Sequence, residues 1–355
     1  MAPRSRAAAV AQAPRLALLG TGTVGRAFVA RYQALQQRRP RLPDFAWLGN
    51  SRTRQACSPN APASALEAAN AAPRGACAPA LAADGLRRGD VLVDATASDA
   101  VAQRHAQWLA RGVHVVTANK LGRGAALERA QQIEAARHAG ASHYGDSATV
   151  GAGLPLLSSV RALAAGGDRI HAVEGVLSGS LAWLFHRYDG ARTFSDCVRE
   201  AAAAGYTEPD PREDLSGEDV RRKLLILARA AGVALRAEQV QVASLLPAAL
   251  VAAAPTELDA ALSTLDAPLA ARLARARANG ACLRFVGRFD AHGASVELRE
   301  LPLGHPLASG AGTDNRVAIH SDRYLQQPLL IQGPGAGAEV TAAALLDDVL
   351  RIAAD

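Results

Sequence analysis

Apolar and polar residues alternate in blocks along the first part of the chain, and the blocks have the lengths of strands and helices in turn. Leu16-Ala-Leu-Leu-Gly20 is a short apolar run, which predicts a buried strand, and apolar residues then recur at helical spacing from residue 27 to residue 35. The predicted strands are 16–20, 45–49, 90–98 and 113–117, and the predicted helices are 27–35, 100–110 and 125–139. This alternation is typical of an α/β fold with a doubly wound parallel sheet.

The pattern changes near residue 155. The predicted elements beyond it are helices at 156–165, 195–204 and 216–232 and a strand at 173–180. Residues 240–320 mix helical and strand patterns, and a glycine loop at Gly333 leads into a C-terminal helix. Earlier in the chain, residues 56–88 are rich in Ala, Pro and Gly and predict one short helix with loops. We therefore expect a second domain of α+β type, with the C-terminal helix packing back on the first domain.

Composition narrows the class of protein. The 355 residues suggest two domains, and 49% hydrophobic with 20% charged residues is ordinary for a soluble protein. The net charge of +6 is spread along the chain in short clusters without interleaved aromatic residues, so nucleic-acid binding is not expected. No apolar run reaches the roughly 18 residues that a membrane span needs. Four cysteines without a CxxC pair fit a reducing compartment, and we expect a cytoplasmic protein.

A glycine-rich turn joins the first predicted strand to the first predicted helix. Gly20-Thr-Gly-Thr-Val-Gly25 has the spacing G-x-G-x-x-G between a strand and a helix. The first two glycines allow a tight turn and the close approach of a pyrophosphate, which then faces the free N–H groups of the helix. The turn predicts a Rossmann-type dinucleotide site. Its residues are Gly20, Thr21, Gly22, Thr23, Val24 and Gly25.

The residues after the second predicted strand influence which dinucleotide binds. A site for NAD usually has an acidic residue here for the ribose 2′-hydroxyl. This chain has no acid there, and Arg52 and Arg54 could instead meet a 2′-phosphate. The sequence favours NADP and leaves NAD open. Because ligands of parallel sheets bind beyond the carboxyl ends of the strands, Thr96, Ser98 and Lys120 are also expected in the cofactor site.

Lysine is almost absent from this chain. Of 39 basic residues, only Lys120 and Lys223 are lysines. An arginine side chain stays protonated in a protein, whereas a lysine can exchange a proton once burial or neighbours shift its pKa. The two exceptions are therefore candidates for proton transfer, and the alternative is that they are ordinary surface lysines.

The second lysine follows an acidic segment. Pro209 and Pro211 are expected to hold Glu208 and Asp210 in a stiff extended segment, and Ser216 is the expected N-cap of the next helix in a capping box. Asp219 and Lys223 are then four residues apart on one helix face. The simplest alternative is a capped helix with one surface ion pair, which contributes at most about 0.5 kcal/mol. That alternative leaves the acidic loop unexplained, since Glu208, Asp210, Asp214 and Asp219 repel one another unless a cationic ligand or a lysine balances them. A substrate with an ammonium group meets this requirement.

The chain resembles the homoserine dehydrogenases, and in particular the dehydrogenase portion of the fused aspartokinase–homoserine dehydrogenases. The matching segments occur in order over nearly the whole chain, and the segment 205–223 is the most specific of them. They are Gly20-Thr-Gly-Thr-Val-Gly25, Ala118-Asn-Lys120, Thr149-Val-Gly-Ala-Gly-Leu-Pro155, Gly175-Val-Leu-Ser-Gly-Ser-Leu181, 205–228 and Gly335-Ala-Gly-Ala-Glu-Val-Thr-Ala342.

The resemblance implies a reaction and a set of roles. The reaction is the NAD(P)-dependent interconversion of L-homoserine and L-aspartate 4-semialdehyde, in the biosynthesis of threonine, methionine and isoleucine. Lys223 would be the principal acid/base, Lys120 would lie near nicotinamide and substrate, and Asp219 would support Lys223. Glu208 and Asp214 would bind the substrate, together with Gly175 and Ser178, while Gly337 would contact the cofactor.

The resemblance also implies a division into domains. We expect residues 14–153 to form the NAD(P)-binding domain, completed by the helix 336–355. Residues 154–335 would form the substrate-binding and dimerisation domain, giving a homodimer or homotetramer, and residues 1–13 would be a disordered tail. We expect no aspartokinase domain in front of this chain and no added regulatory domain after it, and therefore no threonine feedback through such a domain.

Members of this family often bind a monovalent cation, Na⁺ or K⁺, through backbone carbonyl groups and an acidic side chain. Val150 and Ala152 would supply the carbonyl groups. Ser147 stands where the acid is expected, with Asp146 one residue earlier, and this departure weighs against the cation.

Two other functions are compatible with the sequence. A different Rossmann reductase would act on another amino-acid semialdehyde, and the segment 205–223 argues against it. A nucleotide-binding sensor without catalysis would bind NADPH and show no turnover.

Overall fold

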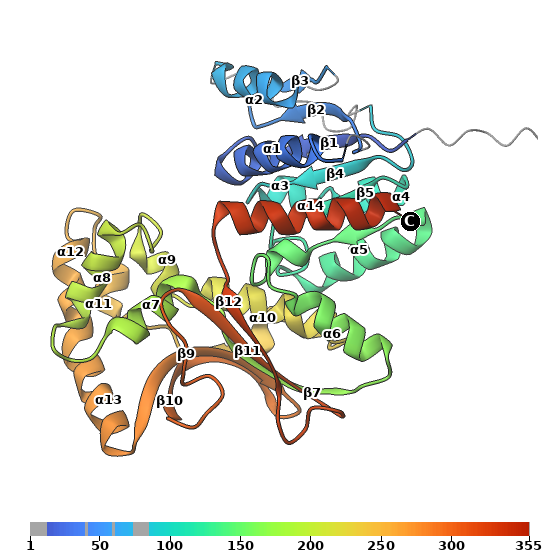
Figure 1. Cartoon of the computed structure of the whole chain (residues 1–355). Coiled ribbons are helices and arrows are strands. Elements are labelled where there is room, and N and C mark those ends of the chain that lie inside the picture. Colours follow the sequence, from blue (N-terminus) through green and yellow to red (C-terminus); the bar gives the residue numbers. More distant parts are fainter. Residues whose placement is uncertain (1–12, 40–41, 59–60, 74–84, 355) are drawn as a thin grey trace, which may run out of the picture.

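The computed structural model describes residues 13–39, 42–58, 61–73 and 85–354 (Figure 1). The tail predicted for residues 1–13 thus lies, except for Ala13, outside the described residues. The chain forms two six-stranded sheets with helices packed against them, one in each half of the molecule. The predicted fold class, a Rossmann-type parallel sheet joined to an α+β part, is confirmed.

The first sheet has the strand order β3-β2-β1-β4-β5-β6, and every neighbouring pair is parallel except β2 with β3. Its strands are β1 (Leu16–Leu19), β2 (Phe45–Gly49), β3 (Arg54–Ala56), β4 (Val91–Asp94), β5 (His114–Thr117) and β6 (Tyr144–Gly145). β1 is apolar on both faces because helices cover both faces. Leu16 and Leu18 pack in one core with Phe28 of a helix, while Ala17 and Leu19 pack on the opposite side.

The helices of this half come from both ends of the chain. They are α1 (Thr23–Gln36), α2 (Pro62–Ala71), α3 (Asp99–Ala102), α4 (His105–Ala110), α5 (Leu127–Gly140) and the C-terminal α14 (Ala338–Ala354). α14 lies beside α1 (Figure 1), and its Leu345 and Val349 belong to the same core as Phe28. Near the end of α14, the buried Asp348 accepts hydrogen bonds from the backbone N–H and the hydroxyl of Ser147, at 3.0 and 2.9 Å.

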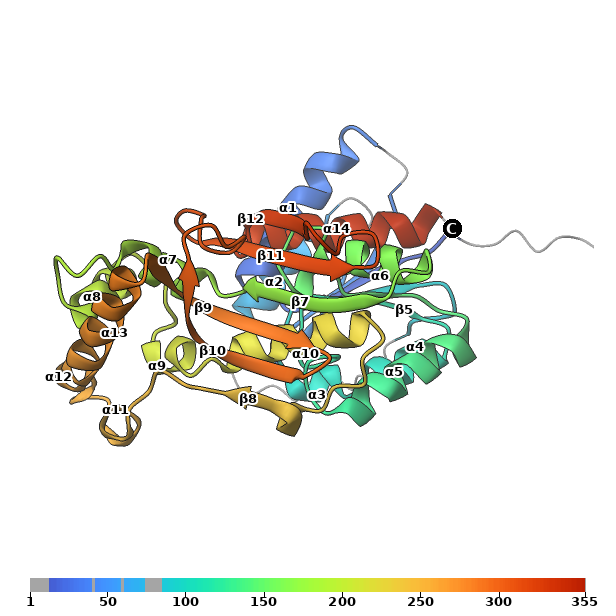
Figure 2. The same ribbon diagram turned by 90° about the horizontal axis from the view of Figure 1, so that it is seen from below.

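The second sheet is mainly antiparallel and has the order β12-β11-β7-β9-β10-β8. Its strands are β7 (Ile170–Val176), β8 (Val240–Val242), β9 (Ala281–Asp290), β10 (Gly293–Pro302), β11 (Asp314–Ser321) and β12 (Leu329–Pro334). α6 (Leu156–Ala165), α7 (Gly179–Arg187) and α10 (Glu218–Ala230) contribute to the core that covers one face. Figure 2 shows the other face of the sheet from below, with the strands in front of these helices. The remaining helices are α8 (Phe194–Ala203), α9 (Pro211–Leu215), α11 (Ala248–Ala252), α12 (Leu258–Ala261) and α13 (Asp266–Ala278).

Two predictions about helix boundaries are wrong. The helix predicted at 100–110 is divided into α3 and α4. The helix predicted from Ser216 begins at Glu218, and Gly217 occupies its N-cap without a side-chain cap, so the predicted capping box is absent. Gly217 has φ +80, and a Cβ atom on it would lie 3.0 Å from the Phe285 ring. Ser216 instead ends α9, a short helix that the sequence pattern did not predict.

None of the described helices is both long and apolar enough to cross a membrane.

Candidate functional site

The two lysines of the chain meet at one carboxylate, although they lie in different halves of the molecule. Lys120 follows β5 at the carboxyl edge of the first sheet, and Lys223 lies on α10. Asp219, one turn earlier on α10, has its Oδ2 atom 2.7 Å from Lys223 Nζ and its Oδ1 atom 3.4 Å from Lys120 Nζ. The ion pair from i to i+4 predicted on α10 is therefore present, and Lys120 extends it to a triad of charges.

Burial and charge act differently on the members of this triad. Lys223 is buried, and its Nζ also donates a 2.7 Å hydrogen bond to the carbonyl oxygen of Leu177. Burial alone would raise the pKa of Asp219, but the charges of Lys223 and Lys120 outweigh it and hold that pKa well below its usual range. The carboxylate therefore stays ionised at neutral pH and balances part of the charge of the two lysines.

The segment that follows Lys120 is held in place by an arginine of α10. Arg229, at the end of α10, donates hydrogen bonds to the carbonyl oxygens of Arg123 and Ala125, the second at 2.8 Å. Gly124 lies so close to α10 that a Cβ atom on it would be 3.0 Å from the carbonyl oxygen of Arg222. The segment that follows Lys120 is thus packed directly on the helix that bears Lys223.

The turn between β7 and α7 faces the acidic segment. Ser178 caps α7 by accepting a hydrogen bond from Leu181 N at 3.2 Å, and Ser180 donates one of 2.5 Å to Asp214. The second oxygen of Asp214 accepts the backbone N–H of Glu208 at 2.8 Å. Asp214 therefore fixes the segment around Glu208 to the start of α7. Gly175 lies on β7, where a Cβ atom would be 2.9 Å from Val317.

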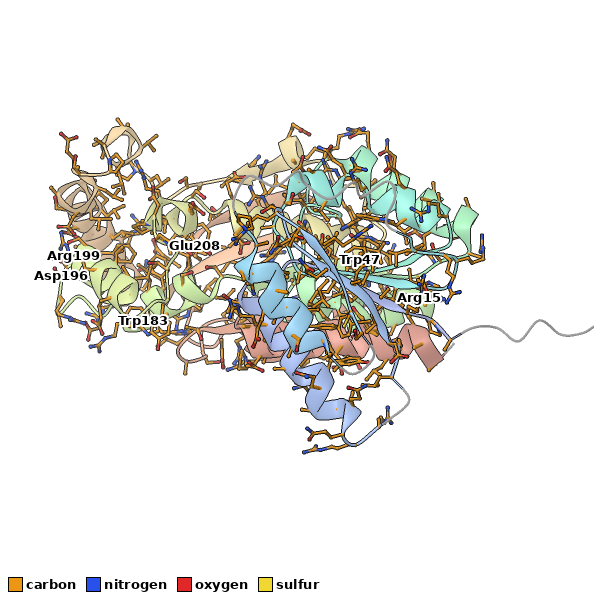
Figure 3. All side chains as sticks on the ribbon, turned by 90° about the horizontal axis from the view of Figure 1, so that it is seen from above. Arg15, Trp47, Trp183, Asp196, Arg199 and Glu208 are labelled. Atoms are coloured by element: carbon orange, nitrogen blue, oxygen red, sulfur yellow. The ribbon has the colours of Figure 1, made fainter. Side chains whose placement is uncertain are left out.

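Glu208 is the acid of this segment whose charge is least balanced. Its side chain is exposed, and the described residues provide it with no hydrogen bond or ion pair. The expectation that a cationic ligand or a lysine balances the acids is met at Asp219, which pairs with the two lysines, whereas Asp210 pairs with Arg212 at 2.7 Å and caps α9. Figure 3 shows Glu208 between α8, the helix that bears Asp196 and Arg199, and the half that contains Trp47 and Arg15. Trp183, labelled in the same view, packs against Tyr206 with ring centroids 5.3 Å apart.

The glycine turn has the shape that a pyrophosphate requires. Gly20 has φ +99, and a Cβ atom on it would lie 2.6 Å from the carbonyl oxygen of Ala95. Gly25 lets the first turn of α1 rest on the carbonyl of Gly20, which a Cβ atom would approach to 1.9 Å. The N-cap of α1, Gly22, makes no side-chain cap, and a Cβ atom there would meet nothing within 4 Å. Thr23 and Val24 open the helix, so its first N–H groups face an open space.

The end of β2 is organised by amide side chains. Thr21 donates a 2.7 Å hydrogen bond to Asn70 of α2 and accepts one of 3.0 Å from Asn50. Arg52 donates to the carbonyl oxygen of Ala72 at 3.0 Å, which holds its guanidinium beside the C-terminal end of α2. Arg54 is in a different position, 5.6 Å from the centre of the Trp47 ring. Arg52 therefore lies at the end of α2, where Asn70 binds Thr21 of the glycine turn, whereas Arg54 lies over the Trp47 ring.

A buried aspartate organises the other strand ends, and sequence analysis missed it. Asp94 ends β4, and one oxygen accepts hydrogen bonds from the backbone and hydroxyl of Thr96 at 2.9 and 2.7 Å. Its other oxygen contacts His105 Nε2 at 2.9 Å and Asn119 Nδ2 at 3.1 Å. Asn119 also donates to the carbonyl oxygen of Ser98, at 2.9 Å. An aspartate at the end of an apolar strand was a visible signal, whereas nothing in the sequence marked His105.

The segment matched to a cation site has an unusual backbone. Gly151 and Ala152 both have positive φ, at +71 and +48, and Val150 is fully buried. Ser147, at the position where an acid was expected, is hydrogen-bonded to Asp348. Asp146 pairs with Arg161 at 2.7 Å, and although burial opposes ionisation, Arg161 and Arg123 hold its pKa below the usual range.

The glycine loop before α14 lies against the turn at α7. Gly337 has φ +117, and a Cβ atom on Gly179 would be 3.9 Å from Cβ of Ala336. A Cβ atom on Gly335 would overlap the buried side chain of Asn315. The loop therefore brings the start of α14 to Ser178 and its neighbours.

Comparison with protein families gives two matches that together span most of the chain. The family model described as homoserine dehydrogenase matches residues 155–350, and the model described as homoserine dehydrogenase, NAD binding domain, matches residues 20–144. The chain belongs to the homoserine dehydrogenase family. The resemblance inferred from the sequence is confirmed, and with it the presence of an NAD-binding domain.

The relatives include fused and separate homoserine dehydrogenases. A chloroplastic bifunctional aspartokinase/homoserine dehydrogenase of Zea mays is 46% identical over 265 residues, which are 74% of this chain and 29% of the maize protein. The homoserine dehydrogenase of Schizosaccharomyces pombe is 39% identical over 271 residues, 74% of this chain and 72% of the yeast protein. This chain therefore spans less than a third of the length of the maize relative.

Solved structures share the fold. A Candida auris protein of unknown function has a TM-score of 0.84 at 34% identity, covering 96% of this chain and 98% of that one. A hyperthermophilic archaeal homoserine dehydrogenase in complex with NADPH has a TM-score of 0.72 at 19% identity, covering 95% of this chain and 97% of that one.

Proposed function

We propose that this member of the homoserine dehydrogenase family catalyses the NAD(P)-dependent interconversion of L-homoserine and L-aspartate 4-semialdehyde, a step in threonine, methionine and isoleucine biosynthesis. The observation that supports it best is the triad of Lys120, Asp219 and Lys223 at the carboxyl edge of the Rossmann-type sheet. Reduction of an aldehyde develops negative charge on oxygen, and a nearby ammonium group can stabilise that charge or supply a proton. The nicotinamide of the bound cofactor supplies the hydride.

Lys223 is the proposed acid/base. An ammonium group has three N–H donors, and two of those of Lys223 are engaged by Leu177 O and Asp219, both at 2.7 Å. The third remains for the substrate oxygen. Lys120, which is about one-third exposed, is proposed to add positive charge next to the nicotinamide and the substrate.

The substrate's polar groups are proposed to bind along the acidic segment. Glu208 would accept a hydrogen bond from the substrate's ammonium or hydroxyl group. Asp214 would also belong to the substrate site. Its two oxygens already accept hydrogen bonds from Ser180 and Glu208, which supports a role in positioning the segment around Glu208. Gly175 and Ser178 would form the wall behind the substrate.

Substitution of Glu208 by glutamine tests this arrangement. The change keeps the shape of the side chain and removes its charge. Because Glu208 is exposed and binds no described side chain, we expect the Michaelis constant for homoserine to rise about tenfold, with an unchanged Tm and NADP affinity. Glu213→Gln, on the exposed side of α9, is the matched control and should leave the Michaelis constant unchanged. A lowered Tm with an unchanged Michaelis constant would contradict substrate binding by Glu208.

The cofactor is proposed to bind along the glycine turn, Gly20 to Gly25. It would also contact Thr96, Ser98 and Lys120 at the strand ends, and Gly337 in the loop before α14. Arg52 is proposed to contact the 2′-phosphate of NADP, because its guanidinium is held at the end of α2, where Asn70 binds Thr21 of the glycine turn. The same site accepts NAD, which lacks that phosphate.

The choice between the two cofactors is tested at Arg52. Arg52→Ala removes a charge next to the 2′-phosphate, so the Michaelis constant for NADP should rise about tenfold or more while that for NAD stays nearly constant. Arg54→Ala is the control, because Arg54 lies over the Trp47 ring. Steady-state kinetics with each cofactor measures both effects. Equal changes for NADP and NAD would show that Arg52 does not read the phosphate.

The remaining assignments belong to the same proposal. Residues 14–153, completed by the helix 336–355, would bind the cofactor, and residues 154–335 would bind the substrate and form a homodimer or homotetramer in the cytoplasm. A monovalent cation, Na⁺ or K⁺, would bind the carbonyl groups of Val150 and Ala152. The left-handed backbone at Gly151 and Ala152 supports this cation, whereas the engagement of Ser147 by Asp348 weighs against it.

The substrate is tested by a screen in the reducing direction. We expect rapid oxidation of NADPH with L-aspartate 4-semialdehyde and little with L-glutamate 5-semialdehyde, whose chain is one methylene longer. A preference for the longer semialdehyde would overturn the proposed substrate.

A further inference from the structure

A cavity lies apart from the residues proposed for the reaction. It has a volume of about 590 Å³ and is lined by residues of α5, α6, the end of α10 and the end of α14. Lys120, Asp219 and Lys223 do not line it, and neither does the glycine turn. Its volume is within the range of small-molecule sites. Five arginines line it: Arg123, Arg137, Arg161, Arg229 and Arg351.

The positive charge of this cavity exceeds the negative charge around it. Arg137 pairs with Glu134 at 2.5 Å, Arg161 with Asp146 at 2.7 Å, and Arg351 with Asp348 at 2.7 Å. Arg123 shares Glu134 and Asp146 with these partners. Within the described part of the chain, the five guanidinium groups therefore meet three carboxylates at ion-pair distance, which leaves an excess of two positive charges.

Arg229 and Arg123 show this excess most clearly. No carboxylate of a described residue lies within ion-pair distance of Arg229, whose donors bind backbone carbonyl groups, and burial lowers its pKa to about 10. The Nε atom of Arg123 is buried and has no hydrogen-bond partner among the described residues. Guanidinium groups bind phosphate and carboxylate through paired N–H donors, so several arginines with an excess of positive charge on one cavity favour an oxyanion.

The apolar residues of the cavity wall narrow the class of ligand further. Leu127, Ala130, Val233 and Ile352 line the cavity together with the arginines. We propose that this cavity binds a small organic dianion, a phosphate monoester or a dicarboxylate, with its charged group on the arginines and its carbon skeleton against the apolar wall.

The position of the cavity would let a bound ligand affect the proposed catalytic lysines indirectly. Arg229 holds the carbonyl groups of Arg123 and Ala125, just after Lys120. A dianion that attracts Arg229 and Arg123 competes with these contacts and shifts the Lys120 segment relative to α10. This consequence rests on the proposed function, whereas binding itself does not.

Binding is tested by calorimetry on the full chain with saturating NADP, which fills the nucleotide site. The probe is phenyl phosphate at a pH of about 8, where the phosphate is a dianion because its second pKa is about 6. Benzenesulfonate has nearly the same shape and a single charge, and succinate tests the dicarboxylate. We expect phenyl phosphate to bind with a dissociation constant of about 1 mM or below, and benzenesulfonate to bind about tenfold more weakly.

A pair of double variants locates the site. Arg137→Gln with Arg351→Gln removes two charges from the rim and should weaken phenyl phosphate binding about tenfold. Arg169→Gln with Arg275→Gln removes two exposed, ion-paired arginines outside the cavity and should leave it unchanged. Absence of binding, equal binding of the sulfonate, or equal loss in both double variants would overturn the proposal. The measurement needs no turnover, so its failure would leave the proposed reaction standing.

Discussion

Replacement of Lys223 by arginine is expected to lower turnover by roughly 10²–10⁴-fold while cofactor binding persists. Arginine keeps the positive charge next to Asp219 but does not give up a proton at neutral pH. The position is buried, and its ammonium donates to Leu177 O at 2.7 Å, so the larger guanidinium also displaces the donor proposed for the substrate oxygen. Turnover of homoserine with NADP measures the effect, and nucleotide titration checks the cofactor site.

A matched variant separates chemistry from folding. Arg222→Lys, the adjacent position on α10, exchanges the same two residue types outside the triad and should leave turnover unchanged. A folded Lys223→Arg protein with turnover near that of the unmodified chain would contradict proton transfer by Lys223.

The second large effect is expected for Asp219→Asn. The change removes the charge that both lysines share, so Lys120 and Lys223 would repel each other across the gap between the sheet and α10. We expect turnover of homoserine with NADP to fall about 10²-fold. Asp210→Asn, whose partner is Arg212, is the control.

The sign of the stability effect at Asp219 follows from its lowered pKa. A carboxylate whose pKa is lowered by folding stabilises the protein at pH values above its unfolded pKa, about 3.9, and this contribution is lost as the pH falls through the lowered value. The Asp219→Asn variant should therefore lose stability relative to the unmodified chain at neutral pH and lose less of it in acid. Unchanged turnover in a folded Asp219→Asn variant would contradict the shared role of Asp219.

The fold could be predicted from the sequence because its main signals lie in short local segments. The apolar run at β1 and the glycine turn after it predict a strand, a phosphate turn and a helix with few alternatives, and the structure has all three. The boundary near Ser216 was predicted wrongly for a physical reason. Ser216 had the residue type of an N-cap, but Gly217 is the residue that tolerates both a positive φ and contact with Phe285. That contact comes from a distant strand and is invisible in the local pattern.

The candidate site was predictable only in part. The spacing of Asp219 and Lys223 gave one ion pair, but the approach of Lys120 to the same carboxylate depends on how α10 packs on the loop after β5. The same holds for Asp94, which reaches His105 and Asn119 through the topology of the sheet. Repulsion among the acids was overestimated because Arg212 and Ser180 neutralise or bind two of them locally.

Lys120, Asp219 and Lys223 are proposed to form the active site of a homoserine dehydrogenase. The most direct test is steady-state oxidation of L-homoserine by the full chain, with NADP and NAD in separate assays, followed by the appearance of reduced cofactor. We predict turnover that requires L-homoserine and is lost in Lys223→Arg. Tight NADP binding without any turnover would contradict it and would mark the chain as a nucleotide-binding sensor.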